Sequence, residues 1–188
     1  MNNRLFIESI GSEEALREGA NSADIAAVAQ ISNKGRRCEV LAWRAIVRRE
    51  LGADVQIGYD EYGAPQIDLP NTYISVSHSR GIVAALVSDT PCAVDIEHSD
   101  RDFRRVSSRY LSEMEREIAE QNNLYAEMWC AKEALYKYYK KGGLDLVEHI
   151  KISEYDESGS QLVATIFDGE PIVVKVGKQN NIAVAIIR

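Results

Sequence analysis

The order of helical and extended segments constrains this chain most. Residues 35–51, "GRRCEVLAWRAIVRREL", are rich in good helix formers and are followed by Gly52, which predicts a helix. Extended runs separated by turn residues follow that helix, at 55–60, 72–79, 82–88 and 92–97. The order then recurs, with helices predicted at 112–121 and 124–141 and strands at 149–156, 161–167, 171–176 and 181–188. We therefore predict an α+β fold with two similar subdomains, residues 1–98 and residues 99–188.

Local signals add detail to this outline. Residues 4–11 predict an opening strand, and the Ala-rich residues 12–31 predict one or two short helices. Ser112 and Glu115 have the spacing of a capping box, which places a helix N-terminus there. The runs 82–88 and 92–97 are joined by a short turn, so we expect them to form a hairpin.

Charge and hydropathy argue against several classes of protein. The net charge of −7 argues against general nucleic-acid binding. No stretch approaches the roughly 18 consecutive apolar residues of a membrane helix, so we expect no membrane span. The first residues lack the basic lead and apolar centre of a signal peptide, and Cys38, Cys92 and Cys130 stand in apolar contexts. We expect a cytoplasmic protein with reduced core cysteines.

Two acidic residues, Asp95 and Glu97, end the predicted strand 92–97. Alternate residues of a strand share a face, and adjacent carboxylates repel one another unless a cation lies between them. Oxygen ligands of this kind favour magnesium, bound partly through substrate phosphates. The spacing is weak evidence alone, because a chain with 29 acidic residues contains several such pairs by chance.

The predicted helix 124–141 carries further charged candidates. Trp129, Glu133 and Lys137 recur every four residues and share one face, with Lys132 on its flank. An ordinary Glu133–Lys137 ion pair explains this spacing. Alternatively, the face supplies a third carboxylate to a metal and two cations to phosphates.

Histidine and arginine side chains offer possible anion ligands. Ser77 and His78 are consecutive on a predicted strand, so their side chains leave opposite faces and do not form a nucleophilic pair. His78 is either a phosphate donor or an ordinary core residue. Arg37 and Arg44 lie on the apolar stripe of the helix, with Arg48 and Arg49 off it, and need an anionic partner there. Either a phosphate or a structural carboxylate meets that need.

Taken in order, these elements resemble the 4′-phosphopantetheinyl transferases, specifically the surfactin-synthetase-activating (Sfp) type. The matching parts are the Arg44 helix, "EYGAPQIDLP", "ISVSHS", "AVDIE" and "WCAKEALYK", across about residues 36–144. The resemblance implies two similar α+β subdomains related by pseudo-twofold symmetry in one monomer, with the active site in the cleft between them.

The resemblance also implies a reaction, the transfer of the 4′-phosphopantetheine arm from coenzyme A to a serine of an apo acyl or peptidyl carrier protein. The second product is adenosine 3′,5′-bisphosphate. Asp95, Glu97 and Glu133 would hold Mg²⁺, and Lys132 and Lys137 would contact the pyrophosphate. His78 and Arg44 would bind the 3′-phosphate, with Arg37 chosen over Arg36 as a further ligand and Ser77 near the phosphates. Glu133 is the leading candidate for the general base, with Glu97 and water as alternatives.

Two other functions are compatible with the same residues. One is a non-catalytic module that binds coenzyme A or docks a carrier protein. The other is a magnesium-dependent phosphodiesterase that releases the arm from a holo carrier. Which carrier is used, whether for fatty-acid, polyketide or peptide synthesis, is open.

Overall fold

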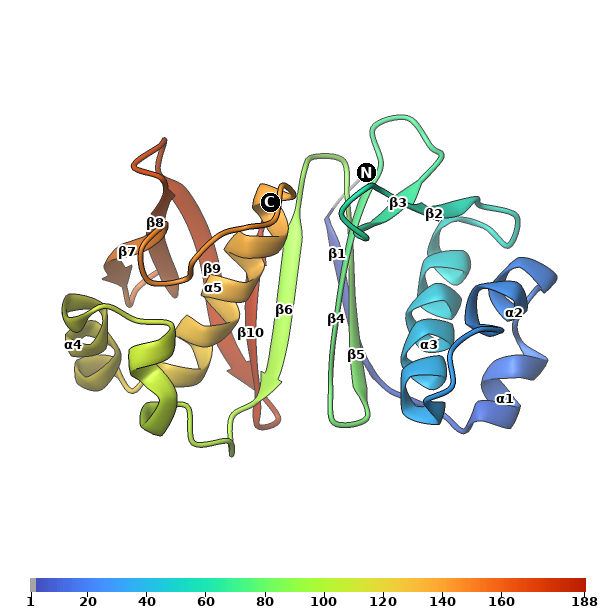
Figure 1. Cartoon of the computed structure of the whole chain (residues 1–188), viewed down its shortest axis with the longest axis horizontal. Coiled ribbons are helices and arrows are strands. Elements are labelled where there is room, and N and C mark those ends of the chain that lie inside the picture. Colours follow the sequence, from blue (N-terminus) through green and yellow to red (C-terminus); the bar gives the residue numbers. More distant parts are fainter. Residues whose placement is uncertain (1–2) are drawn as a thin grey trace. The chain divides into compact units, whose positions relative to one another are not determined.

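The computed structural model describes residues 3–188, and the chain divides into two compact units (Figure 1). Unit 1 is Met1–Pro91 and unit 2 is Cys92–Arg188. The division lies before the predicted boundary after residue 98, because β6 (Ala93–His98) pairs with β10 (Ile182–Ile187) at the end of the chain. The strand that carries Asp95 and Glu97 therefore belongs to unit 2.

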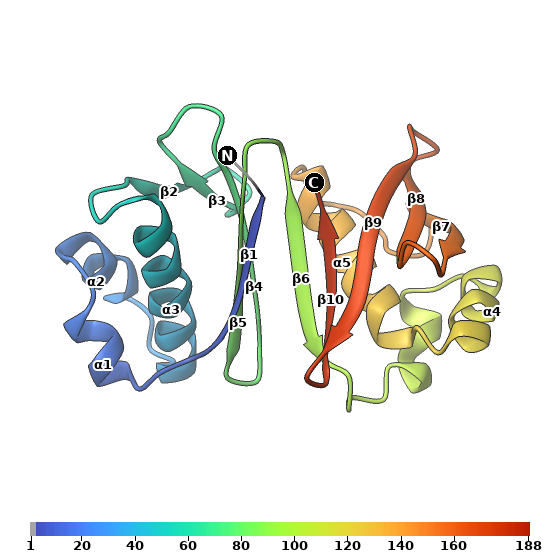
Figure 2. The same cartoon turned by 180° about the vertical axis from the view of Figure 1, so that it is seen from behind.

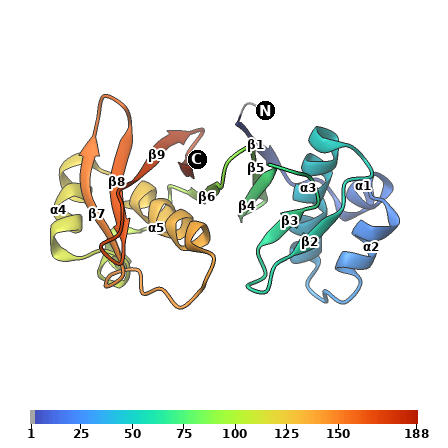
Figure 3. The ribbon, with the colours of Figure 1, turned by 90° about the horizontal axis from the view of Figure 1, so that it is seen from above.

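Unit 1 consists of an antiparallel sheet covered by helices. Its elements are β1 (Arg4–Ser9), α1 (Glu13–Glu18), α2 (Ser22–Val28), α3 (Lys34–Leu51), β2 (Ile57–Tyr59), β3 (Pro65–Ile67), β4 (Tyr73–Ser79) and β5 (Ile82–Ser88). The main sheet has the order β1-β5-β4, while β2 and β3 form a separate pair. Trp43, Ile46 and Val47 of α3 pack with Val83 and Val87 of β5. Seen from above, α3 lies between the sheet and the pair α1 and α2 (Figure 3).

Unit 2 is built around a five-stranded antiparallel sheet with the order β6-β10-β9-β8-β7 (Figure 2). Its other elements are the 3₁₀ helix η1 (Arg104–Arg109), α4 (Glu113–Asn122), α5 (Tyr125–Tyr139), β7 (Ile150–Asp156), β8 (Gln161–Ile166) and β9 (Ile172–Gln179). Cys130, Ala131 and Ala134 of α5 pack in one core with Ala183 and Ala185 of β10. Small residues on both elements bring α5 close to the sheet, which places its polar side chains beside β6.

Most predicted elements are confirmed, including the short helices after residue 12 and the long helix that ends before Gly142 and Gly143. The Ser112–Glu115 capping box is also present, with both of its reciprocal hydrogen bonds. The α+β class is confirmed. In each unit the first strand pairs antiparallel with the last, β1 with β5 and β6 with β10. The twofold relation and the location of the active site in a cleft stay predictions.

The predicted hairpin of residues 82–88 and 92–97 is wrong. β5 is the central strand of its sheet, with β1 on one edge and β4 on the other, so no edge of β5 is left for β6. β6 instead pairs with β10, which lies far away in the sequence. Among residues 3–188, the structure contains no helix with the length and apolar character needed to cross a membrane.

Candidate active site

The two acidic residues of β6 lie on the face of the sheet that α5 covers. Ala93, Asp95 and Glu97 alternate along the strand, and Ala93 lies in the core that includes α5. In the antiparallel register, Asp95 is paired with Ala185 and Glu97 with Ala183. These alanines have little volume, and this leaves room for polar side chains beside the helix.

Lys137 of α5 contacts the first of these acidic residues directly. Its Nζ donates to Asp95 Oδ1 at 2.7 Å and to the Val94 carbonyl oxygen at 3.1 Å. Asp95 is buried, with 6% of its surface exposed, whereas Lys137 is partly exposed. The ammonium group therefore gives the buried Asp95 carboxylate a countercharge.

Glu133, one turn before Lys137, is affected by the same charges. Burial raises the pKa of Glu133, and the charge of Asp95 raises it further, while Lys137 acts in the opposite direction and Glu97 adds to the rise. A raised pKa marks a carboxylate that lies among other negative charges in a partly desolvated place. A bound cation would relieve this repulsion, so the donor set fits a magnesium ion in its chemistry.

The side chains as they stand do not form a closed metal cage. Across residues 3–188, no three His, Cys, Asp or Glu side chains are grouped closely enough to hold a metal ion. Lys137 contacts Asp95, and Arg101 pairs with Glu97 at 3.2 Å. Arg101 also lies over the rings of Phe103 and Trp129. Cations of the protein thus balance the two carboxylates of β6.

Cys130 lies beneath this cluster and is not a nucleophile. The residue is fully buried, and burial together with the charges of Asp95 and Glu97 raises the pKa of its thiol well above the usual range. A raised pKa keeps the thiol protonated and unreactive. All three cysteines are buried and free, as predicted.

Lys132 does not join the cluster, contrary to its predicted contact with the pyrophosphate. Its side chain is fully buried and donates to Glu115 Oε1 at 2.6 Å, with further bonds to the carbonyl oxygens of Leu146 and Ile150. The same Glu115 oxygen accepts from the Ile152 amide. Lys132 therefore ties α5 to α4 and to the start of β7.

Arg44 is likewise committed to the core of unit 1. The residue is 2% exposed, and its Nε donates to Asp24 Oδ1 of α2 at 2.6 Å. Arg48, predicted to lie off the apolar stripe, is also buried and donates through Nε to Asp24 Oδ2 at 2.6 Å. The anionic partner that these arginines need is a structural carboxylate, the alternative left open from the sequence.

Arg37 has a similar structural partner. Its Nε and Nη2 donate to the two carboxylate oxygens of Glu13 in α1 at 2.7 and 3.0 Å. Hydrogen bonds from Arg37 and then Arg17 lower the pKa of Glu13 to about 2. Arg37 thus fastens α1 to α3.

His78 has different neighbours, which sequence reasoning did not assign. Ser77 is buried and His78 is exposed, so the two side chains leave opposite faces of β4 as predicted. Arg36 Nη1 lies 2.6 Å from His78 Nε2, and His78 Nδ1 lies 3.3 Å from Glu39 Oε1. The sequence does show that Arg36 and Glu39 lie one helical turn apart and so share a face of the helix. No local pattern shows that this face meets His78, which follows 39 or more positions later in the chain.

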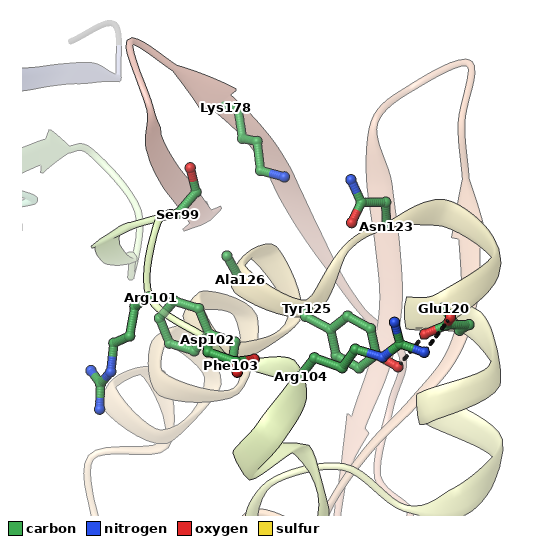
Figure 4. Close-up of a pocket in the computed structure, with 10 residues that line it drawn as sticks. All are labelled: Ser99, Arg101, Asp102, Phe103, Arg104, Glu120, Asn123, Tyr125, Ala126 and Lys178. Carbon is green, nitrogen blue, oxygen red and sulfur yellow. Dashed lines mark hydrogen bonds and ion pairs between the residues drawn. The ribbon is translucent and has the colours of Figure 1, made fainter.

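A pocket of about 210 Å³ in unit 2 is lined in part by Arg101, the partner of Glu97 (Figure 4). Its walls come from Ser99 and the segment 101–104, together with Glu120, Asn123, Tyr125, Ala126 and Lys178. Arg104 and Glu120 pair across it at 2.7 Å, and the Tyr125 hydroxyl donates to Glu120 at 2.8 Å. None of the predicted catalytic, metal or coenzyme residues lines this pocket.

Comparison with known proteins places these observations in a family. The family model of the 4′-phosphopantetheinyl transferase superfamily matches residues 91–187, which is more than half of the chain. The chain belongs to this superfamily. The matched region begins just before β6 and includes Asp95, Glu97, Glu133 and Lys137.

A curated relative supports the superfamily assignment. The chain is 33% identical over 97 residues to "4′-phosphopantetheinyl transferase ffp" of Bacillus subtilis. This alignment covers 48% of the chain and 43% of the relative, so the chain spans less than half the length of the curated relative that it matches.

Proposed function

We propose that the protein transfers the 4′-phosphopantetheine arm of coenzyme A to a serine of an apo acyl or peptidyl carrier protein, with release of adenosine 3′,5′-bisphosphate. The observation that carries the proposal is the group formed by Asp95, Glu133 and Lys137 on β6 and α5. The buried carboxylate of Asp95, the half-buried carboxylate of Glu133 and the ammonium group of Lys137 influence one another there, inside the region that matches the superfamily. Attack on a diphosphate needs a proton acceptor and compensation of negative charge, and these side chains supply both.

Each residue of the group has a distinct proposed role. Asp95, Glu97 and Glu133 would hold Mg²⁺, which when bound neutralises charge on the diphosphate. Lys137 directs its ammonium group to the same place and stabilises the negative charge that builds on the leaving phosphate. Glu133 is the leading candidate to accept the proton of the carrier serine, either directly or through a water. Glu97 and water remain the alternatives for that step.

For the 3′-phosphate of coenzyme A we propose Arg36 and His78 as ligands. Both side chains are substantially exposed and lie together. Arg37 and Arg44 were predicted for this role, but each already binds a carboxylate of unit 1, and Arg44 is almost fully buried. Their contribution is to hold α3, and with it Arg36, in place. Ser77, the neighbour of His78 on β4, is buried.

Mass spectrometry of a carrier tests this function. Incubation of several apo carriers with coenzyme A and magnesium should add the mass of one phosphopantetheine group to at least one of them. The gain should disappear when EDTA removes the metal, and it should disappear for Glu133→Gln. No mass gain with any carrier would contradict the proposal. Loss of the arm from a holo carrier would instead identify a phosphodiesterase, and binding without turnover would identify a docking module.

Compartment, oligomeric state and carrier partner complete the proposal. We propose that the protein acts in the cytoplasm, because its three buried free cysteines suit a reducing compartment. We also propose that it acts as a monomer. Carrier proteins of fatty-acid, polyketide and peptide synthesis are all candidate partners. A survey of which endogenous carrier gains the arm would separate them.

A further inference from the structure

Three side chains of unit 1 make polar contacts with one another. Arg36 and Glu39 project from the first turns of α3, and His78 projects from the end of β4. Arg36 Nη1 lies 2.6 Å from His78 Nε2 and donates to Glu39 Oε2 at 3.1 Å. Glu39 Oε1 lies 3.3 Å from His78 Nδ1. Each member of the set therefore contacts the other two.

These contacts determine where the imidazole carries its proton. A guanidinium group has only donors, so Nε2 of His78 must accept from Arg36. A neutral imidazole that accepts at Nε2 has its proton on Nδ1, and that nitrogen faces the Glu39 carboxylate. The structure thus selects the Nδ1–H form of His78.

Fold stability does not explain why Glu39 contacts Arg36 and His78. The side chains of Arg36, His78 and Glu39 are 50%, 39% and 24% exposed. Ion pairs this exposed contribute about 0–1 kcal/mol to folding. By contrast, the arginines of α3 that hold the fold together bind the buried Asp24.

We propose that Glu39 is a positioning residue that holds His78 in the Nδ1–H form and keeps Nε2 and Arg36 side by side for one phosphate group. The identification of this anion as the 3′-phosphate of coenzyme A rests on the proposed function. On phosphate binding, Nε2 takes up a proton from solvent and donates to one phosphate oxygen, while Arg36 turns to another. The Nδ1–H bond to Glu39 then stabilises the imidazolium ion, as a carboxylate does for any histidine that it orients.

The charges around His78 are consistent with this step. Arg36 and Glu39 of α3 face the ring, and Val83 is the paired residue on β5. Arg36 and Glu39 carry opposite charges, and the Glu39 carboxylate faces Nδ1 of the ring. Without Glu39, the ring would gain less from protonation, and the affinity for a phosphate would fall.

Nitrogen-15 NMR of the histidine rings tests the positioning role without any ligand. At about pH 8, where histidine is normally neutral, wild-type His78 should show the Nδ1–H pattern, with its signals assigned through His78→Gln. On titration, His78 of Glu39→Gln should protonate at a lower pH than wild-type His78, because the carboxylate that faces Nδ1 is gone while Arg36 still donates to Nε2. Glu8→Gln is the matched control, because it removes a carboxylate from Arg49 at the far end of α3. An Nε2–H form in the wild-type protein, or no change in Glu39→Gln, would overturn the proposal.

Ligand binding tests the consequence for phosphate recognition. Affinities for coenzyme A and for 3′-dephospho-coenzyme A should be measured on wild type, Glu39→Gln and Glu8→Gln. Glu39→Gln should bind coenzyme A, but not the dephospho form, about two- to five-fold more weakly, which is the range of an exposed ion pair, while Glu8→Gln should resemble wild type. Equal losses for both ligands, or tighter binding of coenzyme A, would overturn the proposal. If wild type bound neither ligand, the proposed function would fail, and the NMR result would still decide the role of Glu39.

Discussion

Asp95 is the side chain on which the proposed chemistry depends most directly. It is buried, it accepts from Lys137, and its charge raises the pKa of Glu133. Asp95→Ala should therefore lower carrier modification by about a hundred-fold or more, because it removes both a proposed metal ligand and the partner of Lys137. The fold should survive, since Lys137 keeps its bond to the Val94 carbonyl oxygen and is partly exposed to water. Initial rates of carrier modification measure the loss of activity, and circular dichroism shows whether the fold survives.

Glu170→Ala provides the control for this prediction. It also removes a carboxylate, but from an exposed turn of unit 2, and it should leave the rate unchanged. An Asp95→Ala protein that kept the full magnesium-dependent rate would show that the metal assignment is wrong.

For single residues, local periodicity was sufficient to predict some neighbours in the structure and insufficient to predict others. Strand alternation and helical spacing are sufficient to group Asp95 with Glu97, and Glu133 with Lys137, because each pair lies on one element. The arginines of α3 depend on Asp24, which belongs to another helix. No local pattern says which carboxylate reaches an arginine, so a phosphate and an aspartate were equally good partners from the sequence.

Between elements, Lys132 links α5 with α4 and β7 inside unit 2. Lys132→Met should destabilise the protein by about 3–5 kcal/mol, because Glu115 would remain buried without its countercharge. Urea unfolding measures this loss, and Lys175→Met, on the exposed face of β9, serves as the control. The folded variant should keep the wild-type KM for coenzyme A. A raised KM of Lys132→Met without loss of stability would support the predicted contact of Lys132 with the pyrophosphate.

The link between α2 and α3 should make unit 1 sensitive to acid. Burial alone raises the pKa of Asp24, but hydrogen bonds from Arg48 and Arg44 outweigh it and hold the pKa below its usual 3.8. The folded state therefore favours the ionised form, so this contribution is present above about pH 4 and is lost as the pH falls through the lower folded value. Asp24→Asn should remove this contribution to the free energy of unfolding at neutral pH.

Urea unfolding at several pH values between about 3 and 7 tests this dependence. The difference in the free energy of unfolding between wild type and Asp24→Asn should shrink toward the acid end. A difference that stayed constant with pH would contradict the role of the Asp24 charge. Glu170→Gln, which alters an exposed carboxylate, should show no such trend.

The elements themselves could be predicted from the sequence, but their pairing could not. Periodicity, capping residues and turn residues are local, and they located the helices and most strands. Pairing depends on which strand edges are already occupied. β5 looks like one arm of a hairpin with β6, yet β1 and β4 occupy both of its edges. That arrangement depends on contacts between β1 and β5, which more than 70 residues separate in the sequence.

For the whole molecule, the proposed reaction draws on His78 of unit 1 and Glu133 of unit 2. If one chain supplies both, two variants that each lack one group cannot restore one another. A mixture of His78→Gln and Glu133→Gln should therefore modify no more carrier than the two variants do separately. Wild type diluted with either variant is the control, and its rate should follow the amount of wild type. Recovery of activity in the mixture would show that different chains share the reaction, and it would contradict the proposed monomer.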